Sequence, residues 1–225
     1  MVGLEPKHKK EFQLERLILF SDAVFAIAIT LLIIEIKVPH VEERSNIALL
    51  NGLFLIIPKF VGFIISFLLI GQFWINHHKL FGFVRSYDGK VLWLNLFFLM
   101  SIVTMPFSTA LYSENIFIDL SFIIYCINVA ATGIINSLVW RYIGNPKNKF
   151  AEEGIDHELF KYFSTRALLI PAAFIIAIPL TLINPWAGKY APILIAPMMK
   201  FVNKKYKSVI EKHKLKLAEE KSIEE

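Results

Sequence analysis

Six long runs of apolar residues, separated by shorter polar segments, dominate the chain. The runs cover residues 17–38, 48–75, 91–112, 116–143, 167–183 and 186–202. The uninterrupted part of the first run would form a helix about 27 Å long, close to the hydrocarbon thickness of a bilayer. The pattern predicts an all-α membrane protein, a bundle of six transmembrane helices over residues 1–203, followed by a charged tail over residues 204–225.

The last two runs are shorter than the others, and prolines interrupt them. These prolines are Pro171, Pro179, Pro185, Pro192 and Pro197. Because proline removes a helical hydrogen bond, we expect kinked or tilted helices here. An arrangement with four spans and a hairpin is the alternative.

The composition supports a membrane protein, since 56% of the residues are hydrophobic and twenty are phenylalanine. The net charge of +5 does not indicate nucleic-acid binding, because the basic residues lie between the apolar runs and in the tail. The single cysteine, Cys126, excludes an intrachain disulfide and is interpreted as a core residue. The polar N-terminal segment does not resemble a cleaved signal peptide.

Lysine and arginine concentrate in the N-terminal segment, in the second and fourth connections, and in the tail. The opposite side receives only Lys37, Arg44 and Lys189, with Lys59 inside the second run. Because positive charge resists translocation, both termini are predicted to be cytoplasmic. The long fourth connection is then a cytoplasmic loop with a short helix. The lysine-rich tail is either a solvated helix or one that contacts anionic membrane lipids.

The first run carries Arg16, Ser21 and Asp22 at one end. A charge inside a membrane span is costly and usually functional. Further along, Ile27, Thr30, Leu31 and Ile34 fall on a single stripe of a helix with 100° per residue. Such a stripe is compatible with packing against lipid or protein as well as with a pore, and a threonine hydroxyl can bond back to its own helix.

Asp22 needs a partner, and Arg16 lies about 240° away around the same helix, so the two cannot pair there. The second run returns to the same depth and ends with Trp74, Asn76, His77 and His78, whose side chains are hydrogen-bond donors. Adjacent histidines point about 100° apart on a helix and are poorly placed to share one ion, so no metal site is predicted.

The spacing Arg16, Phe20, Ser21, Asp22, with the apolar continuation AVFAIAITLLIIEIKVP and then FWINHHKLF on the second run, resembles the prokaryotic members of the transmembrane protein 175 family. These are potassium-selective cation channels. The resemblance implies six spans per subunit and a homotetramer whose pore is lined by the first helix of each subunit.

The resemblance also implies roles for individual residues. Ile27, Leu31 and Ile34 would narrow the pore, with Thr30 as a polar layer. Arg16, Ser21 and Asp22 would form a hydrogen-bonded network with Trp74 and His77 that holds the pore helix.

No TVGYG-like segment is present, so backbone carbonyls do not form a selectivity filter. The function that the resemblance implies is a potassium-over-sodium channel with a hydrophobic constriction, K⁺ as the permeant ion and no cofactor. On family grounds the location is the bacterial or archaeal plasma membrane. The alternative is a proton-coupled secondary cation transporter that uses Asp22 and His77. A membrane enzyme built on His77, His78 and Asp22 is disfavoured because no nucleophile pairing is present. Glu35, Lys59 and His78 have no assigned role.

Overall fold

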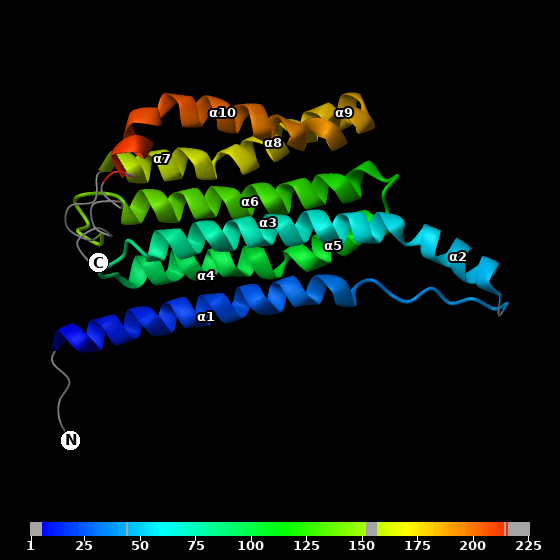
Figure 1. Ribbon diagram of the computed structural model, residues 1–225, viewed down its shortest axis with the longest axis horizontal. Coiled ribbons are helices and arrows are strands. Elements are labelled where there is room, and N and C mark those ends of the chain that lie inside the picture. Colours follow the sequence, from blue (N-terminus) through cyan, green and yellow to red (C-terminus); the bar gives the residue numbers. More distant parts are fainter. Residues whose placement is uncertain (1–5, 44, 152–156, 214, 216–225) are drawn as a thin grey trace, which may run out of the picture.

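The computed structural model describes residues 6–43, 45–151, 157–213 and 215, and it is almost entirely helical there (Figure 1). Its helices are α1 (Pro6–Ile34), α2 (Asn46–Leu55), α3 (Ile57–Phe81), α4 (Gly89–Val103), α5 (Met105–Glu114), α6 (Asp119–Ile143), α7 (His157–Ala167), α8 (Leu169–Ile183), α9 (Pro185–Tyr190), the 3-10 helix η1 (Ala191–Leu194) and α10 (Ile195–Lys205). Of the predicted tail, residues 204–225, the structure describes residues 204–213 and 215, and the rest lies outside the described residues.

Within the described part of the chain, five helical stretches are long and apolar enough to cross a membrane. They are Phe12–Ile34, Ile57–Phe81, Gly89–Glu114, Asp119–Ile143 and His157–Ile183. The third combines α4 with α5 and the fifth combines α7 with α8. Each joint precedes a proline, Pro106 or Pro171, which cannot donate the backbone hydrogen bond that would continue the helix.

The sixth apolar run does not form one long helix. It is divided among α9, η1 and α10, which return beside α8 and α7 (Figure 1). Pro185 begins α9 and Pro192 lies in η1, so each piece is shorter than a transmembrane helix. The described residues therefore contain five long spans where the hydropathy pattern predicts six.

The predicted bounds of the first two spans also need correction. The first helix ends at Ile34 rather than at residue 38. Residues 48–55 belong to α2, which extends away from the bundle, and the second long helix begins only at Ile57 and continues to Phe81 (Figure 1). Pro58, at the start of α3, separates two apolar segments that hydropathy alone joins together.

The connection between α3 and α4 is fixed by Asp88, the N-cap of α4. Its carboxylate accepts hydrogen bonds from the Val91 backbone N–H (2.9 Å) and the Tyr142 hydroxyl (2.7 Å), which ties α4 to α6. Partial burial opposes ionisation of Asp88, but these hydrogen bonds outweigh it and hold the pKa of the carboxyl below its ordinary value. At the other end of the bundle, Lys59 pairs with Glu114 at 2.7 Å, which joins α3 to α5.

Helix α1 lies along one edge of the bundle and packs against α3, α4 and α5 (Figure 1). Its inward face contributes Phe25, Ala28 and Leu32 to the main hydrophobic core, together with residues of α3 to α6 and α8. Only 28% of its most apolar stretch is buried within the subunit. Much of α1 is therefore available to lipid or to other subunits.

Gly188 is required where α9 folds back on α8. A Cβ atom added at this position would lie 2.8 Å from both the backbone N and the Cα of Thr181, which cannot move as a flexible side chain would. We expect Gly188→Ala to destabilise the protein by roughly 1–3 kcal/mol and to lower the Tm measured by thermal unfolding in detergent. Gly89→Ala is the matched control, because a Cβ there meets nothing within 4 Å. An unchanged Tm for Gly188→Ala would mean that α9 does not pack on α8 in this way.

Candidate functional site: the two faces of the first helix

A buried chain of polar groups connects α1 to α3 through α4. Among the described contacts, His77 Nε2 lies 2.9 Å from Asn95 Oδ1, and Asn95 Nδ2 donates to Ser21 Oγ at 2.9 Å. Ser21 Oγ then donates to the Leu17 carbonyl at 2.8 Å. Because Asn95 Oδ1 is an acceptor, His77 donates from Nε2. Asn95 and Ser21 thus each accept one hydrogen bond and donate the next, and the chain ends on the α1 backbone.

This chain lies deep in the protein. Ser21 and Asn95 are fully buried and His77 is 1% exposed. The imidazole is surrounded by Phe25, Phe81 and Phe98, with ring centroids 4.4 to 5.8 Å away. In such apolar surroundings an unpaired polar group is costly, so the hydrogen bonds determine how α1 sits on α3 and α4.

Asp22 lies beside this chain and has a separate partner. Trp74 Nε1 on α3 donates to Asp22 Oδ1 at 2.9 Å. Asp22 is half-buried and Trp74 is exposed along one side. The structure therefore provides Asp22 with a donor from the second long helix, at the depth that the sequence indicates.

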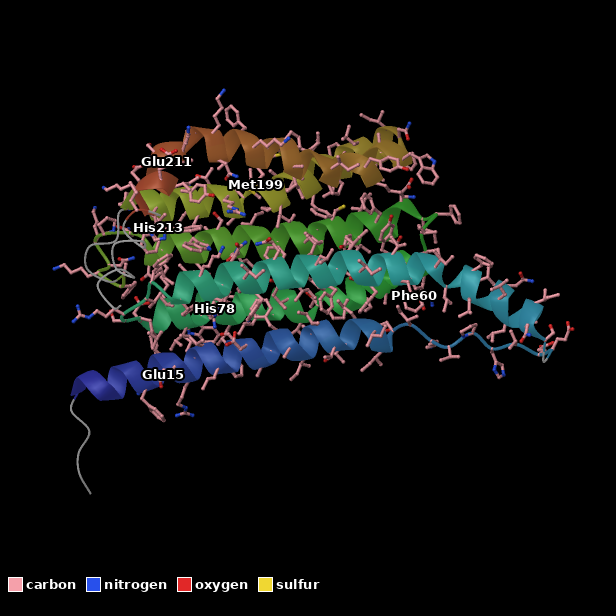
Figure 2. All side chains as sticks on the ribbon, in the orientation of Figure 1. Glu15, Phe60, His78, Met199, Glu211 and His213 are labelled. Atoms are coloured by element: carbon pink, nitrogen blue, oxygen red, sulfur yellow. The ribbon has the colours of Figure 1, made fainter. Side chains whose placement is uncertain are left out.

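The other residues of the predicted network are placed differently. Arg16 is exposed, lies over the Phe12 ring at 6.0 Å from its centroid, and makes no ion pair with Asp22. Phe20 is 52% exposed on the same outward face. Asn76 accepts a hydrogen bond from Gln72 of its own helix, and His78 stacks on Trp74 with ring centroids 5.7 Å apart. Figure 2 places His78 toward the same end of the bundle as Glu15, with Phe60 toward the other end.

Sequence reasoning missed Asn95, which is the link between His77 and Ser21. A signal was present, since Asn95 is an amide in the middle of an otherwise apolar run. A polar residue in that position needs a partner in the bundle interior.

The predicted stripe faces outward from the subunit. Ile27 is 59% exposed, Leu31 37% and Ile34 68%, whereas Phe25 on the opposite side of α1 is 1% exposed. Thr30 is exposed too, and its hydroxyl donates to the Ile27 carbonyl at 2.8 Å. That bond uses the hydroxyl proton and leaves the oxygen lone pairs free to accept. The stripe can thus contact lipid, another subunit or a permeating ion.

The bond between Asp22 and Trp74 is testable by a double-mutant cycle. We expect Trp74→Phe and Asp22→Asn each to lower the Tm, because each weakens a charge-assisted hydrogen bond worth about 1.5–3 kcal/mol when buried and less at a half-exposed site. The double variant should lose less than the sum of the two single losses. Trp93→Phe, at an exposed tryptophan of α4, is the control. Strictly additive losses would show that the two side chains do not interact.

Comparison with known proteins places this arrangement in a family. Residues 16–106, which include α1 from Arg16 onward, α3, α4 and the polar chain, match the family described as the endosomal/lysosomal potassium channel TMEM175. A protein of Chamaesiphon minutus named as a potassium channel is 31% identical over 170 residues, covering 74% of this chain and 83% of the relative. The human protein named as the endosomal/lysosomal proton channel TMEM175 is 25% identical over 130 residues, covering 57% of this chain and 25% of the human protein.

A solved structure shows the same fold. The crystal structure of a lysosomal potassium-selective channel TMEM175 homolog from Chamaesiphon minutus superposes with a TM-score of 0.72 at 27% identity, and covers 85% of this chain and 98% of the other. The sequence match and the structural superposition point to the same family, and the matched residues include the helix that carries the polar chain. The chain therefore belongs to the TMEM175 family of potassium channels, a family of ion channels rather than enzymes.

Proposed function

We propose that the protein is a tetrameric channel that conducts K⁺ in preference to Na⁺, with α1 of each subunit lining a central pore. The observation that carries the proposal is the division of α1 into two faces. One face is held to the subunit by the Ser21–Asn95–His77 chain and by the core. The other presents Ile27, Thr30, Leu31 and Ile34 without any contact that would bury them inside the subunit.

The proposed selectivity follows from dehydration. Four copies of Ile27 around an axis would form an apolar ring that excludes water when narrow. An ion that passes must give up part of its hydration shell, and K⁺ does so at lower cost than the smaller Na⁺. The Thr30 oxygens, one turn away, would offer replacement ligands, since their lone pairs are not used by the bond to Ile27. Leu31 and Ile34 would continue the apolar lining.

In this proposal the subunit has six membrane-crossing segments, the broken α9–η1–α10 segment being the sixth, and both termini are cytoplasmic. The lysine and arginine residues at the end of the bundle where α1 begins support that orientation. We further propose that the protein lies in the plasma membrane of a prokaryote. Its lysine-rich tail would contact anionic lipids there. No cofactor is proposed, because conduction as described here requires only the permeant ion.

A second candidate is a proton-coupled secondary cation transporter that uses Asp22 and His77; the human relative named as a proton channel makes proton movement relevant here. The hydrogen bonds favour conduction of K⁺ over this candidate. Asp22 and His77 have different partners, Trp74 and Asn95, and the chain from His77 ends on a backbone carbonyl, which cannot relay a proton. The hydrogen bonds of Asp22 and His77 instead support a role in positioning α1.

Planar-bilayer recording of the purified full-length protein with K⁺ on one side and Na⁺ on the other tests the proposal. We expect ohmic single-channel currents and a reversal potential displaced toward the K⁺ equilibrium potential. A reversal potential at zero would reject K⁺ selectivity. A saturating flux that requires a proton gradient would instead support the transporter.

A further inference from the structure

A cavity of about 520 Å³ lies between the end of α6, the length of α7 and the end of α10. The parts of α6, α7 and α10 that line it lie at the end of the bundle where α1 begins, and α7 and α10 are on the side of the bundle away from α1 (Figure 1). Helix α7 lines it with one face, at His157, Phe160, Lys161, Ser164 and Thr165, and Leu168 lines it from the N-cap of α8. Gly144 allows the close approach of α6 and α7, because a Cβ there would lie 2.5 Å from that of Phe160. The volume is in the range of small-molecule binding sites.

The charged side chains among the described lining residues are all basic, and none of the lining residues is a carboxylate. Arg141 from α6, Lys161 from α7 and Lys205 from α10 converge on the cavity from three helices. Lys161 is also 3.3 Å from Glu158, which offsets part of its charge. Arg141 and Lys205 have no carboxylate partner among the described residues, so they provide the excess positive charge. Hydroxyl groups of Ser164 and Thr165 lie on the same wall.

One of the lining residues, Trp140, carries a buried hydrogen-bond donor that has no partner among the described residues. Trp140 is 1% exposed and lines the cavity, and its indole N–H has no hydrogen-bond partner within the described structure. The ring is held in place by Phe163, with centroids 4.8 Å apart. A buried N–H without a partner costs free energy, and an acceptor that reached it from the cavity would remove that cost. This indicates a ligand with anionic oxygen atoms.

We propose that this cavity binds a phosphate-bearing anion, with Arg141 and Lys205 as charged donors and Trp140 Nε1–H as the buried donor. A guanidinium and an ammonium group around a cavity larger than one phosphate match a pyrophosphate-like group or the headgroup of an anionic phospholipid. The inference is independent of ion conduction, since the cavity uses none of the residues proposed to line the pore.

Binding is tested with the purified full-length protein in detergent, which separates the two sources of phosphate. One arm titrates potassium pyrophosphate against potassium chloride of equal ionic strength. The other compares micelles doped with phosphatidylglycerol and with phosphatidylcholine. We expect one arm to give a saturable rise in Tm and a saturable change in tryptophan fluorescence. Response to pyrophosphate alone identifies a soluble ligand, and response to phosphatidylglycerol alone identifies a lipid.

The variants assign the response to the cavity. Arg141→Gln with Lys205→Gln should weaken binding by about tenfold or more, since two charge-assisted contacts are removed. Trp140→Phe keeps an aromatic ring in the core but should abolish the fluorescence change and weaken binding. Lys204→Gln, an exposed neighbour of Lys205 outside the cavity, should bind as the natural protein does. No response in either arm, or an equal loss with Lys204→Gln, would overturn the proposal.

Discussion

Replacing Ile27 by asparagine is expected to lower the K⁺ over Na⁺ permeability ratio by about tenfold, equivalent to about 1.4 kcal/mol of discrimination. Ile27 is 59% exposed on the outward stripe of α1. Four amide groups at an apolar ring would coordinate a partly dehydrated Na⁺ and would also keep the constriction wet. The difference in dehydration cost between the two ions would then no longer decide which one passes.

The measurement is the reversal potential under bi-ionic conditions in planar bilayers. Ile27→Val, which stays apolar, should retain selectivity. Ile33→Asn is the matched control, because Ile33 is 44% exposed on the same helix but lies about 120° away from Ile27. An unchanged ratio in Ile27→Asn, or an equal change in Ile33→Asn, would contradict the pore assignment.

Replacing Asn95 by leucine is expected to have the largest effect on stability, with a loss of roughly 2–4 kcal/mol. Asn95 is fully buried and connects His77 to Ser21. Without the amide, the His77 Nε2–H has no acceptor and remains among phenylalanine rings. We expect a lower Tm and less correctly assembled protein on size-exclusion chromatography.

The companion experiment replaces both polar partners. His77→Phe combined with Asn95→Leu should be more stable than Asn95→Leu alone, because no buried donor is then left unpaired and phenylalanine suits the surrounding rings. Ser21 keeps its bond to the Leu17 carbonyl in both variants. Asn76→Leu, at a partly exposed amide of α3, is the control. A double variant less stable than the single one would show that the imidazole contributes by packing rather than by its hydrogen bond.

Hydropathy located most of the long helices. The predicted run 116–143 agrees closely with α6, since a long apolar segment bounded by polar residues has few alternatives. Hydropathy did not predict the break at Ile56, because it joins α2 and α3 into one span. It also did not predict that residues 186–202 are divided among α9, η1 and α10. Apolar residues are found in continuous and broken helices alike, so mean hydropathy does not reveal where the axis changes direction.

The sequence predicted part of the candidate site, as it predicted part of the helix bounds. Asp22 and the polar end of the second run share one depth, and that is enough to suggest a partner such as Trp74. Which donor reaches which acceptor depends on helix rotation. For this reason the sequence-based prediction includes Arg16 in the network and omits Asn95. In the structure Arg16 faces outward, and Asn95 is the central link of the hydrogen-bonded chain.

The chain's order of apolar and polar residues determined on its own that this is a multi-span membrane protein, that α1 carries a charged and hydroxylated end, and that an apolar stripe runs along it. These properties depend on one helix at a time, with a known residue spacing. The tertiary structure alone decided which face of α1 is buried, that Asn95 connects His77 to Ser21, and that basic residues of three helices surround one cavity. Those are relations between helices distant in sequence, set by how their side chains pack together.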